Sequence, residues 1–170
     1  MIARDAGPSV KAIAASRRKA AALRVLHVGA EIFPLLKTGG LADVLGALPV
    51  ALRRAGVDAR VLLPAFPALL SALSGVREVG ALQPHWGGAP AQLLAGHFAA
   101  APLAGVPIYL LRHEALFGRA GNPYSDANGV AYGDNHRRFA LLALATTSSM
   151  TPTADVVAAP ALPSLVRGGV

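Results

Sequence analysis

Two short aliphatic runs flank one amphipathic segment in the first third of the chain. Residues 24–29 form a β-branched and aliphatic run that ends at glycine, which predicts a strand. Apolar residues in 41–55 recur at helical i, i+3, i+4, i+7 spacing, which predicts a helix that Pro49 kinks because proline has no N–H. Residues 58–63 predict a second strand. A strand, a helix and a strand within about 40 residues form a βαβ unit, which builds parallel sheets through right-handed crossovers.

Further along the chain, the runs 91–98 and 106–111 predict two more strands. Residues 112–133 are polar and rich in Gly and Asn, and a loop of that length usually carries function or is disordered. Residues 135–145 predict a helix, and the Thr- and Ser-rich segment 146–153 predicts a flexible break. The sequence therefore predicts an α/β domain with a Rossmann-like parallel sheet.

The composition is that of a folded domain. Hydrophobic residues make up 54% of the 170 residues and charged residues 15%, which excludes disorder for the bulk of the chain. The absence of cysteine excludes disulfides and thiolate metal sites. Prolines and a glycine interrupt the longest apolar run, 98–111, well short of the ~20 residues that a membrane span needs. We therefore expect no membrane association.

The net charge of +7 is concentrated at the N-terminus. Residues 1–24 carry six Lys and Arg residues against Asp5 alone, and the rest of the chain is close to balanced. This distribution argues against nucleic acid as a partner. We interpret 1–23 as a basic extension without the apolar core of a secretory signal, although its Arg, Ala and Ser content resembles a transit peptide. A cytoplasmic protein is the expectation.

The most informative segment joins the first strand to the first helix, at the edge where open α/β sheets bind ligands. Gly39 and Gly40 leave the backbone amides accessible, and the helix N-terminus beyond them offers unpaired donors. Lys37 adds a positive charge suited to a phosphate oxygen, so the segment favours a diphosphate. By pattern alone it is equally a glycine turn with an exposed lysine, and Asp43 either compensates the helix dipole or binds a sugar hydroxyl. The segment is neither a Walker A loop nor G-x-G-x-x-G, which disfavours a nicotinamide oxidoreductase.

The remaining polar candidates favour structural roles. His27 lies on a predicted buried strand and is expected to be a packed core histidine. The other histidines show no metal-ligand spacing, so we expect no metal. Trp86 suits either sugar stacking or, more simply, a surface turn, and Arg137-Arg138 predicts a helix surface with one guanidinium facing a cleft. The long loop and its ends carry three carboxylates, Glu114, Asp126 and Asp134. No pattern in the sequence indicates that two of them act together as a general acid and a general base.

Four blocks of the sequence resemble bacterial glycogen synthases and plant starch synthases, in the order that this family has them. The first is EIFPLLKTGGLADVLGALP at 31–49, and the second is VDARVLLPAFP at 57–67. The third and fourth are NPYSD at 122–126 and YGDNHRRFALL at 132–142. The resemblance covers about 24–145, which we take as a starch-synthase-type N-terminal catalytic domain.

The resemblance implies the GT-B architecture, in which two Rossmann-like domains form the active site between them. The family transfers glucose from ADP-glucose to the non-reducing end of an α-1,4-glucan such as glycogen, with retention and without metal or cofactor. Carried over by motif, Lys37 contacts the donor phosphates and Gly39 and Gly40 let the backbone approach them. Asp43 lies at the helix of that loop and Tyr124 faces the sugar-nucleotide cleft; no catalytic residue is assigned.

The resemblance fails after residue 145, and 146–170 is expected to be a divergent tail. Ala158-Ala159-Pro160 stands where the family has His-Ala-His, beyond a possible strand start at Asp155. We expect the N-terminal half of a GT-B enzyme, incomplete at its C-terminus through truncation or a frameshift, and inactive and poorly soluble by itself. The alternative is a non-catalytic module that binds glucan or regulates a full-length synthase.

Overall fold

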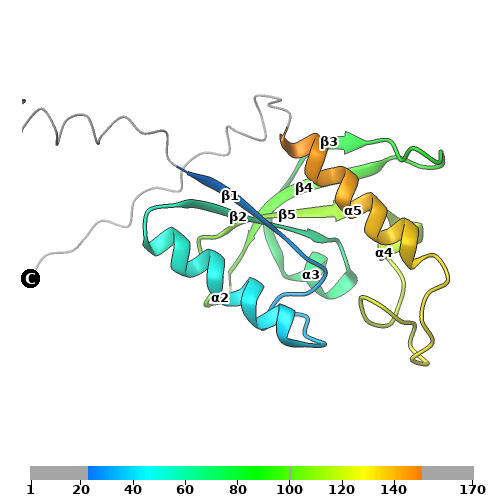
Figure 1. Ribbon diagram of the computed structural model, residues 1–170, viewed down its shortest axis with the longest axis horizontal. Helices are drawn as coiled ribbons and strands as arrows, with labels where there is room; N and C mark the ends of the chain where they lie inside the picture. The colour runs from blue at the N-terminus through cyan, green and yellow to red at the C-terminus, as the bar shows by residue number, and fades with distance from the viewer. Residues whose placement is uncertain (1–22, 100, 151–170) are drawn as a thin grey trace, which may run out of the picture.

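The computed structural model describes residues 23–99 and 101–150 as an α/β fold around one five-stranded sheet (Figure 1). The strands are ordered β1-β2-β5-β4-β3. β1 pairs in parallel with β2 and β2 in parallel with β5, whereas β4 and β3 are antiparallel to their neighbours. In chain order the strands are β1 Arg24–Val28, β2 Asp58–Pro64, β3 Leu73–Leu82, β4 Ala91–Phe98 and β5 Pro107–Arg112.

The parallel half of the sheet is the predicted βαβ unit. Helix α2, Gly40–Arg54, connects β1 to β2 and is continuous through Pro49, whose side chain is buried. Both strands begin within one residue of their predicted starts, because β-branched runs closed by Gly or Pro are strong local signals. The arrangement places the loop before α2 at the carboxyl edge of the parallel strands, as expected.

The antiparallel half was not predicted. Helix α3, Pro67–Ala72, and strand β3 fill a region to which the sequence patterns assigned no element. β3 is mostly exposed, so its sequence lacks the alternation of apolar and polar residues that predicts a half-buried strand. Its pairing with β4 is also irregular, because the register shifts twice. The expectation of a parallel sheet therefore holds for β1, β2 and β5 and is corrected for β4 and β3.

The second long helix, α5, extends beyond its predicted end. It spans Asn135–Met150, so the flexible break expected at 146–153 is wrong for 146–150. The hydroxyls of Thr146 and Thr147 donate to the carbonyls of Ala143 and Leu144, which satisfies these polar side chains inside a helix. Residues 151–153, the remainder of the predicted tail and residues 1–22 of the basic extension lie outside the described residues.

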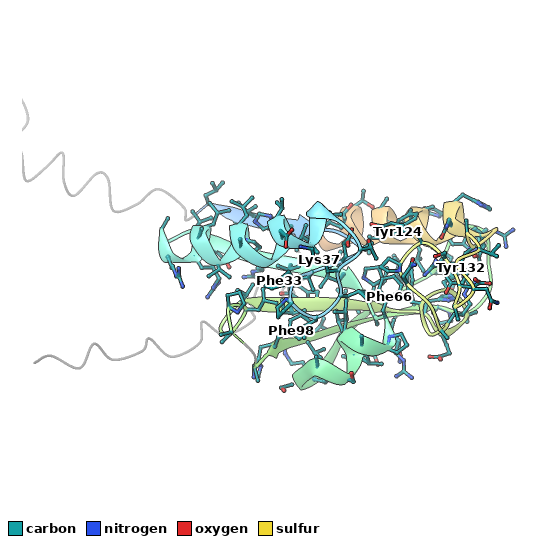
Figure 2. All side chains as sticks on the ribbon, turned by 90° about the horizontal axis from the view of Figure 1, so that it is seen from below. Phe33, Lys37, Phe66, Phe98, Tyr124 and Tyr132 are labelled. Carbon is teal, nitrogen blue, oxygen red and sulfur yellow. The ribbon has the colours of Figure 1, made fainter. Side chains whose placement is uncertain are left out.

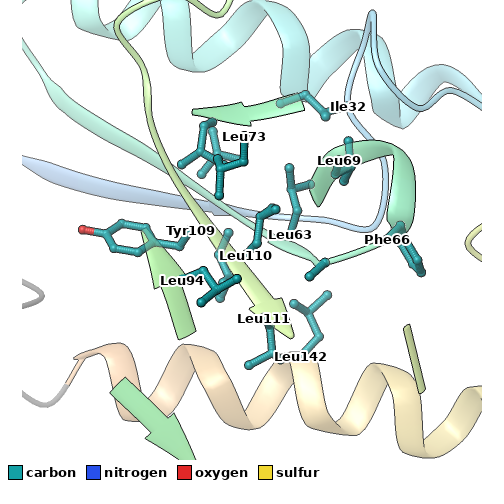
Figure 3. Close-up of a cluster of buried hydrophobic side chains, with 14 of the residues drawn as sticks. Ile32, Leu63, Phe66, Leu69, Leu73, Leu94, Tyr109, Leu110, Leu111 and Leu142 are labelled. Atoms are coloured by element: carbon teal, nitrogen blue, oxygen red, sulfur yellow. The ribbon is translucent and has the colours of Figure 1, made fainter. Parts of the chain in front are cut away.

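The core lies on both faces of the sheet, with α2 and α5 on opposite sides (Figures 1 and 3). Fully buried side chains come from β2, β5 and the helices packed on them, including Leu62, Leu63, Leu69, Leu110 and Leu141, and from β4, which contributes Phe98. A short helix, α4 at Glu114–Phe117, contributes Leu116 and Phe117. Among the described residues no helix is long and apolar enough to cross a membrane.

Candidate functional site

The loop between β1 and α2 is a compact turn closed by its own backbone. Ile32 is fully buried, and its amide and carbonyl both hydrogen-bond to Leu36, the amide at 2.9 Å. The amide of Phe33 donates to the carbonyl of Ala42, which ties the loop to the first turn of α2. These contacts fix the segment from Lys37 to Gly40 at the carboxyl edge of the sheet.

A buried carboxylate organises the end of this loop. Glu31 is 3% exposed, and its Oε2 accepts hydrogen bonds from the Thr38 amide at 2.5 Å, the Thr38 hydroxyl at 2.7 Å and the Gly39 amide at 3.0 Å. Gly39 is the N-cap of α2 and has no side chain to cap it. Glu31 therefore binds the two amides just ahead of the helix, as the acid of a capping box binds the N-cap amide, and the amides of the first helical turn have no side-chain cap in the described part of the chain.

Sequence reasoning missed Glu31, because known capping patterns place the acid inside the first helical turn. Glu31 precedes the helix by nine residues and reaches it only through the fold of the loop. A glutamate among apolar residues just ahead of a glycine helix start was the available signal. Its partners could not be inferred from spacing.

Tyr124 reaches the same carboxylate from the long loop after β5. Its hydroxyl donates to Glu31 Oε1 at 3.1 Å, and its ring stacks on Phe139 of α5 with centroids 5.9 Å apart. The Tyr124 carbonyl accepts a hydrogen bond from the Asn135 side chain at 2.8 Å, at the start of α5. The structure thus brings Tyr124 beside the glycine loop, although 93 positions separate it from Glu31 (Figure 2).

The electrostatics of this pair follow from its burial and hydrogen bonds. Burial by itself would raise the pKa of Glu31, but the hydrogen bonds from Thr38, Gly39 and Tyr124 outweigh it and lower that pKa. For Tyr124, burial and then the neighbouring carboxylate both raise the pKa. At neutral pH the site therefore holds an ionised Glu31 and a protonated Tyr124 that donates to it.

Lys37 and Asp43 form an exposed ion pair at the N-terminus of α2. Lys37 Nζ lies 2.7 Å from both Asp43 oxygens and 5.7 Å from the centroid of the Phe33 ring (Figure 2). Both side chains are about half exposed, so the pair contributes roughly 0–1 kcal/mol and is easily exchanged. An incoming anion can therefore replace Asp43 as the partner of Lys37 at little cost in free energy.

Open space lies over the two glycines. A Cβ added at Gly40 would meet nothing within 4 Å, and one added at Gly39 would only approach Glu31 Oε1 at 3.9 Å. Gly39 has extended backbone that any residue adopts. By contrast, a Cβ at Gly46 would lie 2.6 Å from the Phe33 carbonyl oxygen, so that glycine is required by packing. The packing of this domain therefore does not require glycine at position 39 or 40, and the predicted ligand access there stays a prediction.

Arg138 does not lie on the helix surface as predicted. It is 2% exposed, its Nε donates to the Leu116 carbonyl at 2.9 Å, and its guanidinium stacks 4.1 Å from the centroid of the Tyr132 ring. The neighbouring Arg137 is exposed. Arg138 therefore fixes the long loop onto α5, because hydrogen bonds and an aromatic ring compensate its burial.

The other polar candidates also have structural partners. Asp134 pairs with Arg119 at 2.8 Å, and Asp126 accepts the amides of Asn128 and Val130 in a turn. Trp86 lies in the turn between β3 and β4 and is 40% exposed, as expected for a surface turn.

The histidines form no metal site in the part of the chain that the structure describes. No group of three or more His, Asp and Glu residues there could hold a metal ion. His27 is half-buried on β1, and burial lowers the pKa of its ring. Its Nε2 is buried and has no hydrogen-bond partner among the described residues.

A family model described as "Starch synthase catalytic domain" matches residues 24–160. The chain belongs to this family. It is 53% identical to a glycogen synthase of Variovorax paradoxus over 124 residues, covering 71% of this chain and 24% of that protein. It is 47% identical to a glycogen synthase of Paramagnetospirillum magneticum over 135 residues, covering 79% and 27%.

A solved structure of this starch synthase family shows the same fold. The catalytic domain of starch synthase IV from Arabidopsis thaliana, bound to ADP and acarbose, matches with a TM-score of 0.58 and 26% identity. The match covers 74% of this chain and 24% of that one. The predicted α/β GT-B fold class and the predicted glycosyltransferase family are thereby confirmed. The chain spans about a quarter of the length of the relatives it matches.

Proposed function

We propose that the chain supplies the donor-phosphate side of an ADP-glucose-dependent glycogen synthase. The observation that carries the proposal is the open face over Gly39 and Gly40, beside Lys37 and at the N-terminus of α2, in a member of the starch synthase family. A helix N-terminus with an adjacent lysine is suited to a diphosphate. The related starch synthase IV domain was solved with ADP, which supports an adenine nucleotide donor.

In the proposed reaction the nucleoside diphosphate is the leaving group. Negative charge accumulates on its phosphate oxygens as the bond to glucose breaks, and fixed positive charge stabilises it. Lys37 supplies that charge once it exchanges Asp43 for phosphate. The Gly39 amide is already bound to Glu31, so the backbone donors available to phosphate begin at Gly40.

The glucosyl group would pass to the non-reducing end of an α-1,4-glucan with retention, in cytoplasmic glycogen biosynthesis. Tyr124, held beside the glycine loop, would bound the sugar side of the donor site. A polypeptide of these 170 residues is proposed not to transfer glucose, because GT-B catalysis needs two domains closed on the donor. Reaction rates depend on that positioning and on the exclusion of water.

Calorimetric titration of the 170-residue chain with ADP and with UDP tests the donor site. We expect ADP to bind more tightly than UDP, and Lys37→Ala to weaken ADP binding by about tenfold through the loss of one charged contact. Arg54→Ala, at the opposite end of the same helix and exposed, is the matched control and should bind as the parent does. Failure of the parent chain to bind ADP, or equal binding by the Lys37 variant, would refute the proposal.

Two further measurements separate the donor site from the alternative of a glucan-binding module. Incorporation of labelled glucose from ADP-glucose into glycogen by the purified chain would contradict the proposed inactivity. A thermal melt that shifts with maltooligosaccharide and not with ADP would favour the non-catalytic module.

A further inference from the structure

Glu31 has no part in the donor contacts proposed above, yet it lies at their centre. Glu31 and Arg138 are the charged residues that are buried in the described part of the chain. We propose that Glu31 is a positioning residue that joins the glycine loop and the Tyr124 loop into one unit and thereby holds the phosphate-binding geometry. This inference rests on the proposed function of the site.

The division of hydrogen bonds between the two carboxylate oxygens supports the proposal. Oε2 takes all three donors from Thr38 and Gly39, which are local in sequence, and Oε1 takes the hydroxyl of Tyr124, which is remote. A displacement of Tyr124 would therefore act on the Thr38–Gly39 peptide through this carboxylate, and also through the Thr38 side chain, which interacts with the Tyr124 hydroxyl. The peptide that precedes Gly40 sets the direction in which the next backbone N–H points.

The place of Glu31 keeps the start of α2 open. A Ser, Thr or Asp N-cap at position 39 would place a side chain at the start of α2, where phosphate is proposed to bind. Glu31 holds the amides of Thr38 and Gly39 from the protein interior, and both glycines stay without side chains. The loop is thus fixed, while the amides of the first helical turn have no side-chain partner among the described residues and can bind an anion.

A carboxylate is better suited to this position than an amide. An ionised carboxylate only accepts hydrogen bonds, and all four of its recorded partners donate. In Glu31→Gln the side-chain oxygen can still accept the loop amides and the NH₂ group can donate to the Tyr124 hydroxyl, but these bonds lose their charge assistance. This variant therefore weakens the link between the loops while it retains part of the acceptor for the loop amides.

The first test uses amide NMR resonances of the 170-residue chain without ligand. Charge-assisted hydrogen bonds shift amide protons downfield, so the Thr38 and Gly39 protons should move upfield in Glu31→Gln. They should also move in Tyr124→Phe, which removes the hydroxyl 93 positions away from Glu31. Glu78→Gln, an exposed glutamate on β3, should leave both unchanged. Unmoved Thr38 and Gly39 resonances in Tyr124→Phe would overturn the coupling of the two loops.

The second test measures ADP affinity of the same variants. We expect Glu31→Gln and Tyr124→Phe to bind ADP about tenfold more weakly than the parent, a typical effect of misplaced binding groups, and Glu78→Gln to bind as the parent does. Equal ADP binding by the parent and Glu31→Gln would overturn this inference alone and leave Glu31 a structural acceptor for the loop amides. No ADP binding by the parent would overturn the proposed function as well.

Discussion

At the residue scale, the site is built as much by missing side chains as by charged ones. Gly39 and Gly40 meet open space, while Lys37 lies at the edge of that space in an ion pair that is easily exchanged. Glu31 binds the amides of Thr38 and Gly39 just ahead of the helix. The proposed anion at the start of α2 would account for these features together.

A substitution at Gly40 separates ligand access from folding. Gly40→Ala should preserve or raise the free energy of unfolding, by up to about 1 kcal/mol, since alanine is the better helix former and its Cβ meets no atom. ADP affinity should fall about tenfold, because the added methyl group lies in the space proposed for phosphate. Urea unfolding and calorimetry measure the two quantities.

The control for this substitution is Gly80→Ala on β3, where a Cβ also meets nothing within 4 Å. It should leave ADP affinity unchanged. Parental ADP binding by Gly40→Ala would show that the open face is not the phosphate site.

At the scale of elements, the long loop before α5 is ordered by a small cluster around Tyr132. Arg119 and Arg138 place their guanidinium groups 4.4 and 4.1 Å from the centroid of its ring, and Asp134 pairs with Arg119. The cluster fixes the loop on α5 and thereby places Tyr124 near Glu31. The loop, for which the sequence left function and disorder both open, is thus held by specific side-chain contacts.

Arg138 should be the most sensitive position of this cluster. Arg138→Ala removes the 2.9 Å donor to the Leu116 carbonyl, which keeps the longer bond from Arg119 at 3.4 Å, and removes the stacking on Tyr132, so the free energy of unfolding should fall by about 2–3 kcal/mol. Arg137→Ala, adjacent on the same helix and exposed, should change it by less than about 0.5 kcal/mol. Urea unfolding of the three proteins measures both effects, and equal stabilities would contradict the structural role of Arg138.

At the scale of the whole molecule, three carboxylates in separate regions are held in the ionised state. Hydrogen bonds from Arg60 lower the pKa of Asp58 on β2. Burial opposes ionisation of Asp134 and of Glu31, but hydrogen bonds from Arg119 and from the glycine loop outweigh it and lower both pKa values. The site, the sheet and the long loop therefore share the same sensitivity to acid.

Acid should destabilise the fold. A carboxyl group with a lowered pKa in the folded state contributes stability above its unfolded pKa and loses it as the pH falls through the folded value. With ordinary values of 4.5 for Glu31 and 3.8 for the two aspartates, the free energy of unfolding should decline as the pH falls below about 4.5. Urea unfolding between pH 3 and 7 measures this slope, which should be shallower in Glu31→Gln. Stability that rises on acidification would contradict the assignment.

The sequence by itself determined the local elements and the family. β1, β2, β4, β5 and α2 follow from apolar periodicity and from Gly and Pro at their ends, since these signals act between neighbouring residues. The motif around Lys37, Gly39 and Gly40 could be predicted to face a ligand, because a helix start after a parallel strand has one location in such folds. Their role as donor contacts stays a prediction.

Only the tertiary structure decided which distant groups meet. The antiparallel pairing of β3, the burial of Arg138 and the contact of Tyr124 with Glu31 depend on packing between remote segments, which leaves no fixed spacing in the sequence. From sequence alone a polar residue is expected to be exposed, because the partners that compensate its burial are known only from the fold. For that reason the role of Glu31, which hydrogen-bonds to both loops of the candidate site, could be recognised only in the folded structure.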